Sequence, residues 1–150
     1  MYRYEDATRG IFQSERKVSQ LVSFEGMKYV GVTGKTNVTP TDIDGFIQLE
    51  REGCFIIFEL KHSGGLPIGQ RKALEKLSDS LGQENIVLVA IHNTPIPQKI
   101  IAKDAIVDEY YYKGKWRTTK YNETLGDRVN EFIEFVRKKN VQDKTLYLKR

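Results

Sequence analysis

The side chains of Asp44, Glu59 and Lys61 carry the clearest chemical signal in the sequence. They lie on two strand-like runs, residues 43–49 and 54–62, which are joined by a short polar turn and predict a β-hairpin. If the turn is centred between Arg51 and Glu52, antiparallel pairing places Asp44 opposite Glu59, with their Cβ atoms about 5 Å apart. Because side chains alternate between the faces of a strand, Lys61 shares a face with Glu59. The spacing predicts a carboxylate pair with a lysine beside it.

Such a pair has a definite chemistry. Two carboxylates at this separation repel one another, and a cation between them relieves the repulsion. Mg²⁺ suits the pair because it takes one or two carboxylates and keeps waters and substrate phosphates as its other ligands. A neighbouring lysine can orient a water or stabilise charge that develops on a phosphate. The same residues also fit a surface salt bridge on an ordinary hairpin, so spacing alone leaves both interpretations open.

The order of these residues resembles the core signature of a known nuclease superfamily. Asp44 is followed by fourteen residues and then by Glu59-Leu60-Lys61, a pattern similar to that of the PD-(D/E)XK nucleases, which include restriction enzymes, Holliday junction resolvases, repair nucleases and phage-type nucleases. The resemblance implies hydrolysis of phosphodiester bonds with Mg²⁺, for which Mn²⁺ would substitute. It also implies that Asp44 and Glu59 bind the metal, that the Leu60 carbonyl is a further ligand, and that Lys61 serves the attacking water.

The sequence departs from the family pattern at the first carboxylate. The family's proline directly precedes the aspartate, whereas here Pro40 is followed by Thr41-Asp42-Ile43 before Asp44. Asp42 lies on the same strand face as Asp44, so the choice between them stays open. We favour Asp44 because Gly45 follows it and because the hairpin register places it opposite Glu59.

Two predicted helices flank the hairpin, and each carries a polar residue on its apolar stripe. In the helix expected at residues 11–24, Glu15 either leans towards solvent near the helix start, where the dipole favours a carboxylate, or reaches the metal. Several branches of the resembled superfamily have a glutamate there. In the helix expected at residues 67–81, Gln70 either bonds the backbone or, as resolvase-like and exonuclease-like branches imply, helps to position the lysine, the water or the scissile phosphate.

Residues 34–36, Gly-Lys-Thr, resemble the end of a phosphate-binding P-loop. A P-loop needs its first glycine five residues before the second, and that position is Tyr29. It also needs a helix that begins at the phosphates, whereas the following residues lead into a strand. The sequence therefore disfavours nucleotide hydrolysis and indicates a basic turn at the edge of the site, where Lys35 can contact a DNA backbone.

A second hairpin is predicted at residues 104–120, with a basic tip and aromatic sides. Lys113, Lys115 and Arg117 are its candidate DNA-binding residues, because interleaved aromatic and basic side chains suit phosphates and exposed bases. The same surface can contact a partner protomer. Alternatively, the tyrosines pack over the core while the lysines keep the edge strand soluble. The sequence favours neither of these interpretations over the other.

The elements follow one another as helix, strand, hairpin, helix, strand, hairpin and helix. The apolar run at residues 86–91 is a central strand covered on both faces, and residues 124–139 form the clearest helix. With the first hairpin counted as two strands, the first six elements match the αβββαβ core of the resembled superfamily, so we expect an α/β, restriction-endonuclease-like fold with a mixed central sheet. Residues 1–150 are expected to form one domain, with a core at about 11–92, an added hairpin and helix at 104–139 and a basic tail at 140–150.

Composition points to a cytoplasmic protein. Hydrophobic content of 39% and charged content of 29% are those of a globular domain, and the net charge of +4 leans towards a polyanionic partner. The one cysteine, Cys54, excludes an intrachain disulfide and favours a reducing compartment, where we expect it to be a small buried hydrophobe. The N-terminus lacks the apolar stretch of a signal peptide, and no apolar run approaches the ~20 residues that span a bilayer.

Together these features predict a Mg²⁺-dependent DNA nuclease, which we expect to be an endonuclease, and the resemblance implies a role in repair or recombination. Because so compact a chain has no separate domain for recognising a DNA sequence, we expect structure-specific or weakly sequence-specific cleavage, similar to that of junction resolvases. We expect His62 to be a bystander or a DNA contact and His92 to be structural. A homodimer follows only by analogy with resolvases. The alternatives are an inactive nuclease-fold module that binds nucleic acid and a protein-interaction module that uses the aromatic hairpin.

Overall fold

The computed structural model describes residues 26–27, 29–30, 37–38, 43–82 and 84–148. The chain divides into two compact units, residues 1–42 and 43–150. In the first unit the short strands β1 (Tyr29–Val30) and β2 (Asn37–Val38) form an antiparallel pair. The helix predicted at residues 11–24 lies outside the described residues. The strand that carries the Glu59-Leu60-Lys61 motif belongs to the second unit.

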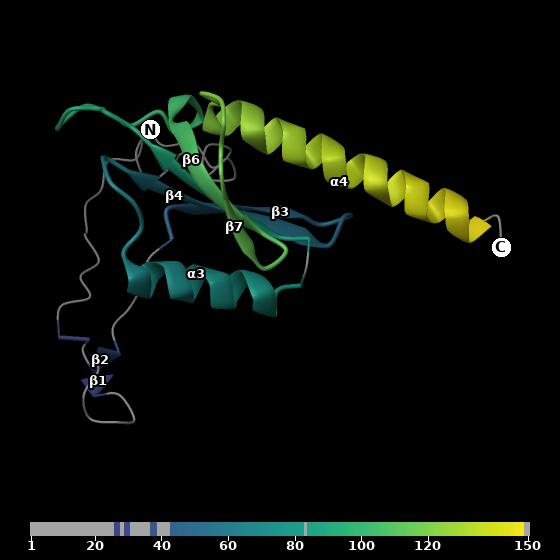
Figure 1. Cartoon of the computed structure of the whole chain (residues 1–150), viewed down its shortest axis with the longest axis horizontal. Helices are drawn as coiled ribbons and strands as arrows, with labels where there is room; N and C mark the ends of the chain where they lie inside the picture. The colour runs from purple at the N-terminus through teal and green to yellow at the C-terminus, as the bar shows by residue number, and fades with distance from the viewer. Residues whose placement is uncertain (1–25, 28, 31–36, 39–42, 83, 149–150) are drawn as a thin grey trace, which may run out of the picture. The chain divides into compact units, whose positions relative to one another are not determined.

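The second unit has an α/β fold built on a five-stranded mixed sheet (Figure 1). The strand order is β3-β4-β5-β6-β7. Strands β4 and β5 are parallel, and the other neighbouring pairs are antiparallel. The strands are β3 (Gly45–Leu49), β4 (Cys54–Lys61), β5 (Ile86–Ile91), β6 (Ile106–Tyr112) and β7 (Lys115–Thr118). A parallel pair needs a crossover connection, which helix α3 (Ile68–Ser80) provides between β4 and β5.

The middle of the sheet is the most deeply buried part of the second unit. In β5, the side chains from Ile86 to Ala90 are at most 1% exposed, which confirms the prediction of a central strand covered on both faces. Cys54, at the start of β4, is 1% exposed, as expected for a small buried hydrophobe. Burial raises the pKa of its thiol, which keeps the side chain protonated and unreactive.

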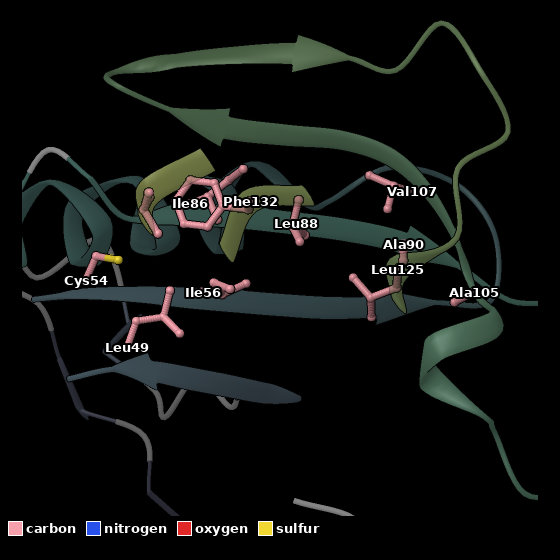
Figure 2. Close-up of a cluster of buried hydrophobic side chains, with 11 residues drawn as sticks. Leu49, Cys54, Ile56, Ile86, Leu88, Ala90, Ala105, Val107, Leu125 and Phe132 are labelled. Atoms are coloured by element: carbon pink, nitrogen blue, oxygen red, sulfur yellow. The ribbon is translucent and has the colours of Figure 1, made fainter. Parts of the chain in front are cut away.

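Two helices cover opposite faces of this sheet. On one face, Ile56 and Leu88 pack against Phe132 of α4 (Leu125–Leu148), and Figure 2 shows this cluster. On the other face, Ile57 and Val89 pack with Leu74 of α3. The alternation of β4 side chains between these two clusters fixes Glu59 and Lys61 on the α3 face.

Helix α4 is longer than the sequence pattern predicts. It begins at Leu125, where the Oγ1 of Thr124 accepts a hydrogen bond from the amide of Asp127 at 3.2 Å and caps the first turn. It continues to Leu148 through residues expected to form a basic tail, because residues 140–148 contain no glycine or proline to end it. In the described part of the chain, no helix is long and apolar enough to cross a membrane.

Strands β6 and β7 form the predicted second hairpin, which turns at Lys113 and Gly114, both with positive φ. Two of its three tyrosines, Tyr111 and Tyr112, face opposite ways. Tyr111 is 4% exposed on the α3 face, whereas the Tyr112 ring lies 6.0 Å from that of Phe132 on the α4 face. These rings pack against the two helices, as in the alternative in which the tyrosines cover the core.

Helix α3 is attached to this hairpin by three charged residues spaced four apart, Arg71, Glu75 and Asp79, which therefore form one stripe. Their partners all lie on β6 and β7, and we call this set the α3–hairpin contacts. Arg71 Nη2 lies 2.5 Å from Glu109 Oε1, Trp116 Nε1 donates to Glu75 Oε1 at 2.6 Å, and the Tyr111 hydroxyl donates to Asp79 Oδ1 at 2.8 Å. The stripe fixes the position of α3 over the sheet.

A buried amide joins the end of α3 to the start of β4. Asn85 is 2% exposed, and its Oδ1 accepts a hydrogen bond from the backbone N–H of Phe55 at 2.7 Å. Its Nδ2 donates to the carbonyl of Gly82 at 2.9 Å and to that of Ser78 at 3.3 Å. One buried side chain thus satisfies three backbone groups.

We predict that Asn85→Ala lowers the free energy of unfolding by about 2–4 kcal/mol, because the change leaves backbone groups without partners. Urea unfolding followed by Trp116 fluorescence measures this. The matched control is Asn130→Ala on the exposed face of α4, which should change stability by less than about 0.5 kcal/mol. Equal stability of the two variants would contradict the role given to Asn85.

A second prediction concerns alkaline pH. Burial and the hydrogen bond to Asp79 raise the pKa of Tyr111 from 10.0 to about 12. The folded state therefore holds the phenolic proton more tightly than the unfolded chain, so this stabilisation is fully present below pH 10 and is lost as the pH rises towards 12. Tyr111→Phe should be less stable at pH 9, by about 1 kcal/mol, and should lose stability less steeply between pH 10 and 12.

Urea midpoints measured between pH 10 and 12 test how steeply stability falls with pH. Tyr121→Phe is the control, because Tyr121 is 76% exposed and its substitution should leave the wild-type slope unchanged. If the stability of Tyr111→Phe fell as steeply with pH as that of the wild type, the raised pKa of Tyr111 would not be the cause of the loss.

Candidate active site

The pairing of β3 with β4 follows the register predicted from the turn. Gly45 lies opposite Phe58, and the register extended by one residue places Asp44, immediately before β3, opposite Glu59. The backbone of Gly45 lies close to the Phe58 side chain, because a Cβ on Gly45 would lie 2.3 Å from the Phe58 ring. Glycine after Asp44 therefore lets the two strands pair up to the carboxylate.

Asp44 is held against the motif on β4 by its own side chain. Its Oδ2 accepts a hydrogen bond from the backbone N–H of Leu60 at 2.6 Å. The N–H and C=O of one strand residue point to the same edge, so the Leu60 carbonyl also faces the β3 side. On the other edge of β4, the Lys61 carbonyl accepts from the His92 amide at 2.9 Å. Asp44 and the Leu60 carbonyl thus lie on the same side of the strand.

Glu59 is the most deeply buried charged residue in the described part of the chain, with 2% exposure. It lies on the α3 face in the same cross-strand row as Val89 and Glu109. A carboxylate this deeply buried needs a proton, a counter-charge or a metal ion. Glu59 and Asp44, the two carboxylates predicted from the sequence, lie opposite one another in the extended register of β3 and β4.

Lys61 contacts the glutamine that sequence analysis selected. Its Nζ donates a hydrogen bond to Gln70 Oε1 at 2.7 Å. Gln70 is the third residue of α3, so its side chain leaves the first turn of the helix towards the sheet. Both side chains are partly buried, which reduces the freedom of the lysine. The structure thus brings Gln70 and Lys61 together.

Arg71 and Glu109 adjoin this site and were not singled out from the sequence. Arg71 follows Gln70, pairs with Glu109 at 2.5 Å and stacks over Trp116, with its guanidinium 4.3 Å from the ring centroid. The spacing of Arg71, Glu75 and Asp79 is a signal for a charged stripe, but the partners of that stripe depend on how the distant hairpin packs. Arg71 connects the site to the α3–hairpin contacts.

The two histidines lie at the carboxyl ends of β4 and β5. Their rings, those of His62 and His92, meet edge to face with centroids 5.5 Å apart. His92 Nδ1 accepts from the Thr94 amide at 3.3 Å, which assigns the neutral ring proton to Nε2. The pair borders the site at the end of the sheet where Lys61 lies.

Lys113 and Lys115 lie at the other end of the sheet, and the guanidinium of Arg117 reaches towards that end. Strand β5 begins at Ile86, opposite Tyr112 and next to the hairpin tip, and ends at Ile91, opposite Lys61. Lys113 pairs with Glu84 at 3.7 Å, Arg117 donates to the Tyr112 carbonyl at 2.8 Å, and Lys115 is exposed. The structure does not gather these residues around the carboxylates.

Three residues considered in the sequence analysis, Glu15, Lys35 and Asp42, lie outside the described residues. The preference for Asp44 over Asp42 rests on the Asp44–Leu60 hydrogen bond and on the register.

The oxygen atoms gathered here match the ligands that Mg²⁺ prefers. Among the described ranges, no group of three or more histidine, cysteine or acidic side chains is placed to hold a metal ion. Mg²⁺ needs fewer protein ligands, because waters and substrate phosphate oxygens complete its octahedron. The Asp44 and Glu59 carboxylates and the Leu60 carbonyl fit that set.

Comparison of the chain with protein-family models, curated proteins and solved structures gave no match.

Proposed function

We propose that the protein is a Mg²⁺-dependent DNA nuclease with a restriction-endonuclease-like core of the PD-(D/E)XK type. The observation that carries this proposal is the hydrogen bond from the Leu60 amide to Asp44, at the centre of the Glu59-Leu60-Lys61 motif. It supports a site in which the sequence motif and the preceding aspartate act together. The α/β architecture of the second unit is compatible with such a core from the β3–β4 hairpin onwards.

The chain's own groups divide the work between metal binding and charge stabilisation. The carboxylates of Asp44 and Glu59, with the carbonyl of Leu60, would hold the ion. Bound Mg²⁺ would hold a non-bridging phosphate oxygen and lower the pKa of the attacking water. Lys61 donates hydrogen bonds only, so its ammonium group orients the water or stabilises negative charge on the phosphate. The Gln70 amide oxygen takes one of the three lysine N–H groups and leaves the other two for the substrate.

The substrate is DNA that is held mainly by its backbone. The net charge of +4 favours a polyanion, and the candidate site lies at an end of the sheet where loops leave β4 and β5. The aromatic side chains of β6 and β7 are engaged with α3 and α4, which weakens the alternative of a protein-interaction module based on that hairpin. A nuclease-fold module that binds DNA without cutting it is the remaining alternative, and cleavage assays separate it from an enzyme.

We predict that Asp44→Asn, Glu59→Gln and Lys61→Met each reduce Mg²⁺-dependent cleavage of labelled DNA by about 100-fold or more, because each removes a charge needed in the transition state. The assay uses duplex, single-strand, flap and four-way-junction DNA with Mg²⁺, Mn²⁺ or EDTA. The matched controls are Glu134→Gln and Lys138→Met on the exposed face of α4, which should retain wild-type rates. DNA binding without any cutting by the wild type would favour the binding module.

A second prediction concerns Gln70 as a positioning residue. Gln70→Ala should lower kcat by about tenfold and leave KM nearly unchanged, because Lys61 loses its orienting acceptor but not its charge. Gln70→Glu keeps an acceptor oxygen and should restore most of the rate. Gln142→Ala on α4 is the control. A loss that appears in KM alone, or that Gln70→Glu does not restore, would argue against positioning.

A further inference from the structure

A pocket of about 700 Å³ lies between two loops at one end of the sheet. One loop connects β5 to β6, and the other connects β7 to α4. Its volume falls in the range of about 300–1,000 Å³ that is typical of small-molecule sites. None of the groups proposed above for metal binding lines this pocket, so it is a separate feature of the fold.

The pocket adjoins the candidate active site. Ile91, which lines the pocket, is the register partner of Lys61 on the neighbouring strand. His92, which also lines it, donates its backbone N–H to the Lys61 carbonyl at 2.9 Å. Adjacent strands are about 4.8 Å apart, so the pocket begins one strand away from the lysine backbone. A ligand here would lie at the same end of the sheet as a phosphate at Lys61.

The walls of the pocket are fixed by hydrogen bonds between its two loops and β6. The Leu125 amide donates to the Ala105 carbonyl at 2.7 Å, and the Val107 amide donates to the Glu123 carbonyl at 2.9 Å. Thr119 Oγ1 donates to the Val107 carbonyl at 2.6 Å. The pocket is therefore formed before a ligand arrives, which lowers the entropy cost of binding.

The lining combines an apolar part with groups that recognise a base. Ile91 and Ile106 are the apolar residues at the strand ends, and Tyr121 is an aromatic residue that is 76% exposed. In the described part of the chain, the amide side chain of Asn122 makes no hydrogen bond to the protein. An exposed ring beside an available amide suits a ligand with a flat face and a hydrogen-bonding edge.

The charged groups around the pocket include both signs. Lys99 and Lys120 suit a phosphate, and Asp104 and Asp108 can accept hydrogen bonds from the amino group of a base. Asp108 is the extra residue of a bulge, because the register of β6 on β5 shifts between Val89 and Ala90. Bulges commonly redirect a side chain next to a functional site.

We propose that this pocket binds one unpaired nucleotide of the DNA substrate, with the base against Tyr121 and the apolar side chains and the phosphate near the two lysines. The proposal rests on the nuclease function proposed above. A base can enter such a pocket only when it is unpaired, so the pocket selects flaps, junctions or single strands over continuous duplex. One edge of the pocket lies beside Lys61, so the bound nucleotide would lie at the same end of the sheet as the cleaved bond.

The test uses deoxycytidine 5′-monophosphate, whose base has an amino group, as a probe that requires neither metal nor cleavage. In two-dimensional NMR spectra of the full chain, the probe should shift the amide signals of residues 92–94 and 119–122. Tyr121→Ala should weaken its binding about tenfold, and Tyr121→Phe should bind within about twofold of the wild type, because the phenyl ring still stacks. Phe135→Ala, which removes a ring that is 49% exposed on α4, is the matched control and should bind as the wild type does.

Deoxyribose 5-phosphate, which lacks the base, should bind at least about tenfold more weakly than the nucleotide. The absence of shifts at these amides, or equal binding by the wild type and Tyr121→Ala, would overturn the proposal. Cleavage assays on the same variants separate the two claims. Cleavage without nucleotide binding removes the pocket and keeps the nuclease, whereas nucleotide binding without cleavage keeps the pocket and removes the nuclease.

Discussion

The register of β3 on β4 is the constraint on which the candidate site depends. Because side chains alternate along a strand, a slip of one residue would turn the side chains of β3 to the opposite face of the sheet and move Asp44 away from Glu59. The close approach of Gly45 to the Phe58 ring and the hydrogen bond from Leu60 to Asp44 both require the observed register. Burial of Ile56 and Ile57 on the two faces of β4 fixes the strand itself. Apolar packing along β4 thus holds a charged motif at the end of the strand.

The second requirement is the placement of α3, since Gln70 can meet Lys61 only if the first turn of the helix lies over β4. The apolar contact of Leu74 with the sheet does not choose the direction of the helix axis by itself. The α3–hairpin contacts supply that choice, because they attach the helix at Arg71, Glu75 and Asp79 along its length. The hairpin, for which DNA contact and packing over the core were equally weighted interpretations, therefore has a structural role in aligning the site.

Local features of the fold could be predicted from the sequence, and distant ones could not. The register of the first hairpin follows from turn position and alternation, and the burial of β5 follows from its unbroken apolar run. The Lys61–Gln70 contact was accessible only through the resemblance to a nuclease family, because spacing alone left Gln70 with a backbone role. The directions of Tyr111 and Tyr112 stayed open, since both faces of that hairpin carry aromatic residues. The partner of Arg71 lies 38 residues away, and no local pattern identifies it.

The groups of the candidate site are close in sequence as well as in space. Asp44 and Leu60 are 16 residues apart, and Lys61 and Gln70 are 9 apart, whereas the α3–hairpin contacts span 32 to 41 residues. Closing a short loop costs less entropy than closing a long one. The carboxylates and the lysine therefore meet at a lower entropy cost than the two sides of the α3–hairpin contacts. The local part of the site is cheap to form, and its final alignment depends on contacts that close much longer loops.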